Sequence, residues 1–308
     1  MKLELGVNSV CIDRRYSFDW LFDLMAESGI RNLQLASFFE MYFLEDEWFH
    51  SLAEKAKQRN IRIKSLFTSL RELNGYMTGD NSLERVARLN YLRLLHVANV
   101  LGADTAGSTM GACYRDKMHT KKEGIKRYIE FLNEMSHVAF EADIQALLIE
   151  PMSCLAEPPT LPEECNFVIN EWKAYRQYNQ DTVPIYFIGD ITHGYADSNE
   201  RVVHHPLKLF EMQIPHMCEF HFKNTDALFN STFGFGGEEQ SRGIIKLQEV
   251  KEILVRNMDR FPTDTITGYL EISGPRIGRD YSDRKLGSML KESLAALKNE
   301  FGDFGGCA

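Results

Sequence analysis

The sequence contains no stretch of apolar residues that approaches the length of a membrane span. Its first residues, MKLELGVNSVCI, lack the basic segment and the long apolar block of a secretory signal. Cysteine is scarce and scattered, without a CxxC pair, which favours a reducing compartment over a disulfide scaffold; the six are Cys11, Cys113, Cys154, Cys165, Cys218 and Cys307. We therefore expect a soluble cytoplasmic protein with no membrane partner.

An excess of positive charge is also lacking. The chain has 35 Lys and Arg against 44 Asp and Glu, a formal net charge of -9. A protein that binds a phosphate backbone needs a clustered positive surface, so no nucleic-acid partner is expected. A few local Lys or Arg side chains can still hold one small anionic substrate.

Linkers, low-complexity segments and close repeats are absent too. With 308 residues, of which 44% are hydrophobic, the chain is long enough to bury a large core. We predict one catalytic domain over residues 1–300 and a flexible C-terminal tail over 301–308.

What the sequence does contain is an alternation of short apolar runs with segments of helical period. The clearest helical segments are 18–29, 83–102, 124–142 and 247–258, and several end in Gly or Asn, as a helix C-cap does. Eight strands are predicted, over 3–7, 32–37, 61–67, 103–108, 146–151, 183–190, 217–223 and 266–272.

Repeated strand-helix units predict parallel strands, and eight such units close naturally into a barrel. The predicted fold class is therefore α/β, a single-domain (β/α)₈ TIM barrel. A doubly wound open sheet is the alternative, but no GxGxxG follows the first strand, where the loop reads NSVCIDRR.

Four successive predicted strands carry a metal-binding type of side chain near their carboxyl ends, where barrel enzymes place their sites. They are Glu150, Asp190, His221 and Glu271. Three carboxylates would repel one another unless a divalent cation lay between them. The set predicts one divalent metal ion, with Mn²⁺, Mg²⁺ or Co²⁺ favoured and Zn²⁺ possible.

Two further residues are candidates for contact with a substrate. His193 follows Asp190 by three positions and can hydrogen-bond a substrate oxygen, ligate the metal or support a ligand. Glu157 either contacts the substrate or caps the next helix.

At these residues the sequence resembles the xylose isomerase-like TIM-barrel superfamily of sugar and sugar-phosphate isomerases and epimerases, especially ketose 3-epimerases and pentulose-phosphate epimerases. The resemblance covers the strand order of essentially the whole chain. Its motifs are the strand-end Glu150, Asp-x-x-His at 190–193, H-x-K-N-T at 221–225 and EISGPRIGRD at 271–280.

The resemblance implies that Glu150, Asp190, His221 and Glu271 hold one metal and that the two glutamates exchange protons with substrate carbon through a cis-enediolate. His193 would steady the carbonyl oxygen, and Glu157 would touch a terminal hydroxyl. The expected enzyme is an isomerase or epimerase of carbohydrate metabolism, acting on a ketose or, as the favoured form, a tetrulose or pentulose phosphate.

One departure from the family concerns the substrate. Free-ketose epimerases have an Arg six positions after the metal-binding His, where this chain has Ala227. Lys223-Asn224-Thr225 instead resembles the Lys-Asp-Thr of enzymes for phosphorylated ketoses. Because the loops after strands seven and eight are the usual phosphate site of a barrel, the candidate phosphate contacts are Lys223, Arg242, Arg276 and Arg279.

Other classes remain as alternatives. The same metal chemistry would serve a lyase, either a dehydratase of the inosose type or an oxo-acid decarboxylase. An endonuclease IV-type repair enzyme is disfavoured because its additional histidines and a basic surface are missing, and a non-catalytic barrel is disfavoured because buried unpaired carboxylates are costly. A homo-oligomer, dimer or tetramer, is expected.

Overall fold

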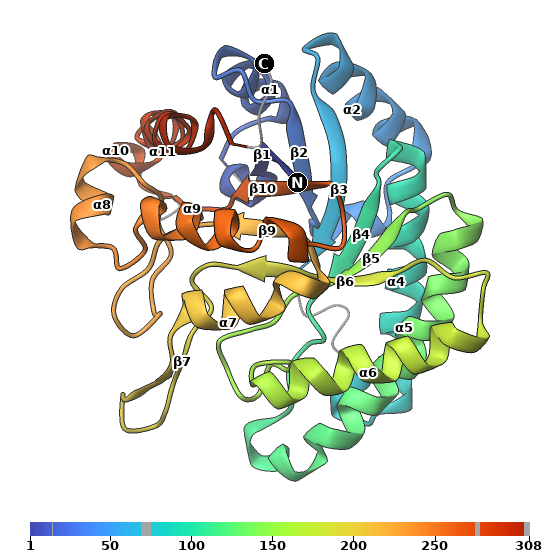
Figure 1. Cartoon of the computed structure of the whole chain (residues 1–308). Helices are drawn as coiled ribbons and strands as arrows, with labels where there is room; N and C mark the ends of the chain where they lie inside the picture. The colour runs from blue at the N-terminus through green and yellow to red at the C-terminus, as the bar shows by residue number, and fades with distance from the viewer. Residues whose placement is uncertain (14, 69–74, 275–277, 305–308) are drawn as a thin grey trace. The chain divides into compact units, whose positions relative to one another are not determined.

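The computed structural model describes residues 1–13, 15–68, 75–274 and 278–304. Eight parallel strands form a closed barrel in the order β1-β10-β9-β6-β5-β4-β3-β2 (Figure 1). All eight strands predicted from the sequence are confirmed; they are β1 (Lys2–Asn8), β2 (Asn32–Ala36), β3 (Arg62–Thr68), β4 (Thr105–Ser108), β5 (Ala146–Ile149), β6 (Ile185–Asp190), β9 (Met217–Phe222) and β10 (Thr265–Leu270).

The chain divides into two compact units, and the first comprises residues 1–35, 51–63 and 188–308. It holds β1, β9, β10 and nearly all of β2. Its helices are η1 (Ser9–Ile12), α1 (Phe18–Glu27), α7 (Pro206–Gln213), η5 (Ile214–His216), α8 (Gly237–Arg242), α9 (Leu247–Arg256), η6 (Met258–Arg260), α10 (Asp280–Asp283) and α11 (Leu286–Phe301). Helix α2 (Asp46–Gln58) begins in the second unit and ends in the first.

The second unit comprises residues 36–50 and 64–187 and holds β4 and β5. Its helices are η2 (Phe39–Tyr42), α3 (Gly75–Thr78), α4 (Asn81–Leu101), η4 (Arg115–Thr120), α5 (Lys121–Glu141) and α6 (Pro162–Tyr178). The four helices expected from periodicity correspond to α1, α4, α5 and α9. No helix in the described part of the chain is long and apolar enough to cross a bilayer.

Each unit buries its own group of aromatic rings. In the first unit, Phe222 packs against Phe220 and Phe301, with ring centroids 4.6 and 5.1 Å away. In the second, Phe131 stacks on Tyr76 at 4.3 Å and meets the ring of Tyr91 edge-on at 5.1 Å. Aromatic side chains bury large apolar areas, so the first group holds α11 on β9 and the second holds α3, α4 and α5 together.

Helix α4 shows how local sequence sets the bounds of an element. The carboxylate of Asp80 accepts hydrogen bonds from the backbone N–H groups of Ser82 and Leu83, at 2.8 and 3.3 Å. At the other end Gly102 has a φ of 66°, in the left-handed region where glycine is favoured. The Gly predicted to end this helix does so.

A short hairpin after β6 was not predicted. Its strands β7 (Tyr195–Ala196) and β8 (Val202–His204) pair antiparallel, and Asp197 accepts hydrogen bonds from the guanidinium of Arg201 across the turn. Strands of two and three residues are too short for an alternating pattern to reveal them.

The register of β9 and β10 aligns the residues that matter for the site. His221 lies opposite Tyr269, and Glu219 opposite Thr267. Side chains two positions apart leave a strand on the same side. Glu219, His221 and, just beyond the strand, Lys223 therefore share one side of β9.

Candidate metal centre

Asp190 is the last residue of β6, and its side chain is completely buried. Its Oδ1 accepts hydrogen bonds from the backbone N–H and the hydroxyl of Thr192, at 2.7 and 2.6 Å. Its Oδ2 is an ion-pair partner of Lys223 Nζ at 2.6 Å, so the ammonium compensates part of the charge of this buried carboxylate.

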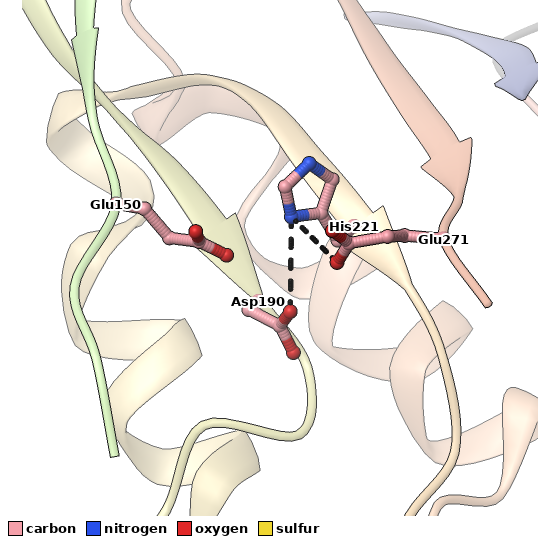
Figure 2. Close-up of side chains that lie close together, drawn as sticks. All are labelled: Glu150, Asp190, His221 and Glu271. Carbon is pink, nitrogen blue, oxygen red and sulfur yellow. Dashed lines mark ion pairs between the residues drawn. The ribbon is translucent and has the colours of Figure 1, made fainter. Parts of the chain in front are cut away.

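His221 and Glu271 complete the part of the cluster that lies within the first unit. His221 Nδ1 is 3.3 Å from Glu271 Oε2 and 3.7 Å from Asp190 Oδ2. Figure 2 shows this ring nitrogen directed at the two carboxylates. The His221 side chain is fully buried, and that of Glu271 is 15% exposed.

Glu150, at the carboxyl end of β5 in the second unit, is the fourth member. It is buried, and its backbone N–H donates to Ser108 O at 3.3 Å. One potential ligand atom from each of Glu150, Asp190, His221 and Glu271 lies within 4.8 Å of the others (Figure 2). Over the described ranges of the chain, no other group of three or more such side chains meets this condition.

Lys223 directs its ammonium group at the same carboxylates. Nζ lies 2.7 Å from Glu271 Oε2 as well as 2.6 Å from Asp190 Oδ2, and the side chain is only 10% exposed. The sequence suggested Lys223 as a phosphate contact, and its ammonium here faces the candidate ligands. By formal count, the three carboxylates and one ammonium carry a charge of -2, which one divalent cation would neutralise.

The charges around the cluster favour the ionised carboxylates. Burial raises the pKa of Asp190, but the charges of His193 and Lys223 outweigh it and hold that pKa well below its usual range. For Glu271, burial again raises the pKa, whereas His221 and Lys223 lower it, and the net shift is downward. Ionised carboxylates and an imidazole suit a hard or borderline divalent ion, so the residues present fit a metal.

The other candidates lie at different distances from this cluster. His193 is adjacent to it, because its Nε2 is 3.6 Å from Asp190 Oδ2 and its backbone N–H donates to Asp190 O at 3.4 Å. Glu157 is half-buried in the loop after β5 in the second unit. Glu164, rather than Glu157, caps the start of α6, because its carboxylate accepts from the N–H groups of Thr160 and Leu161.

Lys223 contacts the carboxylates of the cluster, whereas the other candidate phosphate contacts that the structure describes have different partners. Arg242 ends α8 and is exposed, with its guanidinium 4.0 Å from the centre of the Phe233 ring. Arg279 is exposed at the start of α10 and donates to the carbonyl of Gly278. Arg276 lies outside the described residues.

Gln34 is a site residue that sequence reasoning missed. It lies in β2, fully buried, and its Oε1 is 2.7 Å from Nε2 of His221, the ring nitrogen opposite the one that faces the carboxylates. The only signal in the sequence is an amide between two leucines in NLQLA. Strand alternation alone accounts for such a residue, so nothing in the sequence ties it to His221.

Comparison with known proteins yields structural relatives only. No protein-family model and no curated protein sequence matches the chain. Its structural neighbours are xylose isomerase-like TIM-barrel proteins.

Three of these neighbours show the range of their chemistry. D-psicose 3-epimerase from Clostridium cellulolyticum H10 is 14% identical, with a TM-score of 0.72 over 99% of this chain and 100% of that one. AsbF from Bacillus anthracis, described as a probable 3-DHS dehydratase, is 13% identical, with a TM-score of 0.67 over 96% and 99%. The IOLI protein with a bound zinc atom is 14% identical, with a TM-score of 0.69 over 98% and 99%. At these identities the likeness establishes the barrel fold and leaves substrate and reaction open.

Proposed function

We propose that this chain is a divalent-metal-dependent isomerase or epimerase that moves a carbon-bound proton of a ketose or ketose phosphate. The observation that carries the proposal is the group formed by Glu150, Asp190, His221 and Glu271, whose ligand atoms lie within 4.8 Å of one another. Epimerases among the neighbours of the same fold support it. The metal in the proposal is Mn²⁺, Mg²⁺ or Co²⁺, and the zinc of one neighbour keeps Zn²⁺ as a further candidate.

A bound divalent ion would polarise the carbonyl and the neighbouring hydroxyl and so acidify the adjacent C–H. Glu271 is suited to take that proton, because the surrounding charges keep its carboxylate ionised. Breaking the C–H bond leaves its electron pair on the substrate, delocalised as an enediolate. If the proton comes from C3 of a ketose, delivery of a solvent-derived proton by Glu150 to the opposite face of C3 would give an epimer. If it comes from C1, delivery of a proton to C2 would give an aldose.

The proposal also gives roles to three further side chains. Lys223, held at hydrogen-bonding distance from Glu271, would stabilise negative charge that develops on a substrate oxygen. His193, next to Asp190, would hydrogen-bond the carbonyl oxygen of the substrate, and Glu157 would contact its terminal hydroxyl.

Because Lys223 faces the carboxylates, recognition of a substrate phosphate would rest mainly on Arg242 and Arg276.

The first test is elemental analysis of purified, undialysed protein together with deuterium exchange. We expect about one divalent ion per chain and incorporation of solvent deuterium into an active ketose or ketose phosphate in D₂O. A screen of free and phosphorylated ketoses would find that substrate, and light scattering would test the proposed dimer or tetramer. Protein without metal, whose activity is indifferent to EDTA, would overturn the proposal.

A lyase is the second candidate, because an ammonium group adjacent to Glu271 could also protonate a departing hydroxyl. A dehydratase among the structural neighbours supports this alternative. Mass spectrometry of the product separates the two reactions. An isomer keeps the mass of the substrate, whereas a dehydratase product has lost one water.

A further inference from the structure

The orientation of His221 can be traced through hydrogen bonds to the backbone of the loop after β1. The side chain of Asn8 caps η1, the 3₁₀ helix in that loop, and its Oδ1 accepts a hydrogen bond from the backbone N–H of Val10 at 2.8 Å. A backbone N–H can only donate, so the oxygen of the Asn8 amide must face it. The Asn8 NH₂ group is thereby directed the other way, toward Gln34.

The orientation of the Asn8 amide in turn determines that of the Gln34 amide. Asn8 Nδ2 donates to Gln34 Oε1 at 2.6 Å, and Gln34 Nε2 donates to Glu219 Oε2 at 3.4 Å. The Gln34 NH₂ group thus faces Glu219 while the Gln34 oxygen faces Asn8, which is the orientation that the Asn8 amide requires. Both neighbours therefore present the oxygen of Gln34 to His221.

His221 then has one way to make its bond to Gln34. Its Nε2 is 2.7 Å from Gln34 Oε1, an acceptor, so Nε2 carries the hydrogen. In a neutral imidazole the other nitrogen then holds a lone pair. That nitrogen, Nδ1, is the one that faces Asp190 and Glu271.

We propose that Gln34, oriented by Asn8 and Glu219, is a positioning residue that sets the tautomer of His221 and directs its Nδ1 lone pair into the metal centre. This inference rests on the proposed function for the identity of the ligand. Gln34 and His221 are both completely buried, so water does not substitute for the bond. Partners that orient a ligating histidine commonly change metal affinity 10- to 100-fold when they are removed.

The experiment compares two variants of Gln34 with the wild-type chain. Gln34→Leu keeps the size of the side chain and removes the acceptor. The double variant Gln34→Glu/Glu219→Gln exchanges amide and carboxylate, so that an oxygen still accepts from His221 and an amide still bridges the two positions. Gln213→Leu is the matched control, because Gln213 is also a buried glutamine of the first unit, at the end of α7.

Two readouts are used on the full chain, namely Mn²⁺ affinity by calorimetry and the ring nitrogen shifts of ¹⁵N-labelled histidine in the metal-free protein, at a pH at which the imidazole of His221 is neutral. Comparison with a His221→Asn spectrum assigns the His221 signals among the nine histidines. We expect Gln34→Leu to bind Mn²⁺ about 10- to 100-fold more weakly and to lose the single Nε2–H tautomer. The double variant and Gln213→Leu should keep both the affinity and the tautomer.

The outcomes separate this inference from the proposed function. If the wild-type chain binds no divalent ion, the proposed metal centre is wrong, but the histidine spectrum still tests the hydrogen bonds that run from Asn8 through Gln34 to His221. Unchanged affinity and an unchanged tautomer in Gln34→Leu would overturn the inference with the metal centre intact. If Gln34→Leu does not fold, failure of the double variant to preserve the Nε2–H tautomer overturns it instead.

Discussion

Glu271 and Lys223 form a close charged pair of the candidate centre within the first unit. Each lies one residue beyond its strand, and the two strands are neighbours, so the side chains meet with Nζ 2.7 Å from Oε2. An ammonium at this distance keeps Glu271 ionised and also lies where negative charge would develop on a substrate. The proposed base and its electrostatic support are therefore supplied by adjacent strand ends.

Glu271→Gln should separate proton transfer from metal binding. The amide retains an oxygen ligand but cannot accept the substrate proton, so we expect turnover at saturating metal to fall by about 10²- to 10⁴-fold. Deuterium incorporation in D₂O should fall by a similar factor. The control is Glu163→Gln, the same change at an exposed position in the first turn of α6. Retention of exchange in Glu271→Gln would assign the base to another residue.

Individual residues differ in how far the sequence could predict their role. Asp190 is the last residue of β6 and His221 the last but one of β9, and both strands have a clear apolar pattern, so their position near the carboxyl ends followed from the pattern. The direction of Lys223 did not, because a flexible four-carbon chain can reach either the carboxylates or solvent. The role of Gln34 depends on hydrogen bonds from β1 and β9, which are far from it in sequence.

At the scale of elements, strands and long helices were predictable because their periodicity and capping residues are local. The hairpin of β7 and β8 was missed because each strand is short, and its pairing comes from a turn held by Asp197 and Arg201. Local signals therefore predict the elements that form the barrel better than the loops that follow the strands.

Gly102→Ala tests the left-handed cap of α4. A Cβ at Gly102 would meet no atom within 4 Å, so its cost comes from the φ of 66° alone. We expect the free energy of unfolding to fall by about 1 kcal/mol in urea denaturation. Gly237→Ala is the control, because its Cβ also enters open space and its φ is not in the left-handed region. Equal effects of the two changes would show that the backbone conformation is not what Gly102 supplies.

Glu211 joins α7 to α9 and gives a pH-dependent test within the first unit. Its carboxylate accepts hydrogen bonds from Arg256 at 2.8 and 2.7 Å and from Asn257 at 2.8 Å. The hydrogen bonds from Arg256, and then that from Asn257, lower the pKa of Glu211 from 4.5 to about 2. Because the folded-state pKa is lowered, the stabilisation is complete above about pH 4.5 and is lost as the pH falls toward 2.

Glu211→Gln should therefore lower the free energy of unfolding by about 1 kcal/mol at pH 7, a value reduced by solvent screening. The difference from wild type should shrink when the same urea denaturation is carried out at pH 3. Glu249→Gln, an exposed change in the first turn of α9, serves as the control. A difference that is the same at both pH values would contradict the ionic origin of the stabilisation.

For the whole molecule, metal binding and stability are linked if the proposed centre exists. A cation that binds the folded chain alone, at 100 times its Kd, stabilises it by about 2.7 kcal/mol, or about 5 °C in Tm. We expect Mn²⁺ to raise the Tm of EDTA-treated wild-type protein by about this amount. Asp190→Asn should abolish most of the rise, because it removes the charge of a fully buried carboxylate that belongs to the candidate ligand group.

The matched comparison is Asp226→Asn, the same change at a turn carboxylate that accepts from Ser231 and from the backbone N–H of Leu228. Asp226→Asn should lower the Tm with and without Mn²⁺ and leave the increment from Mn²⁺ unchanged, because Asp226 is not a member of the cluster. Equal Tm values with Mn²⁺ and with EDTA in the wild-type chain would mean that the carboxylates are held together by Lys223 and their hydrogen bonds alone. In that case the barrel would stand without the cation on which the proposed proton transfer depends.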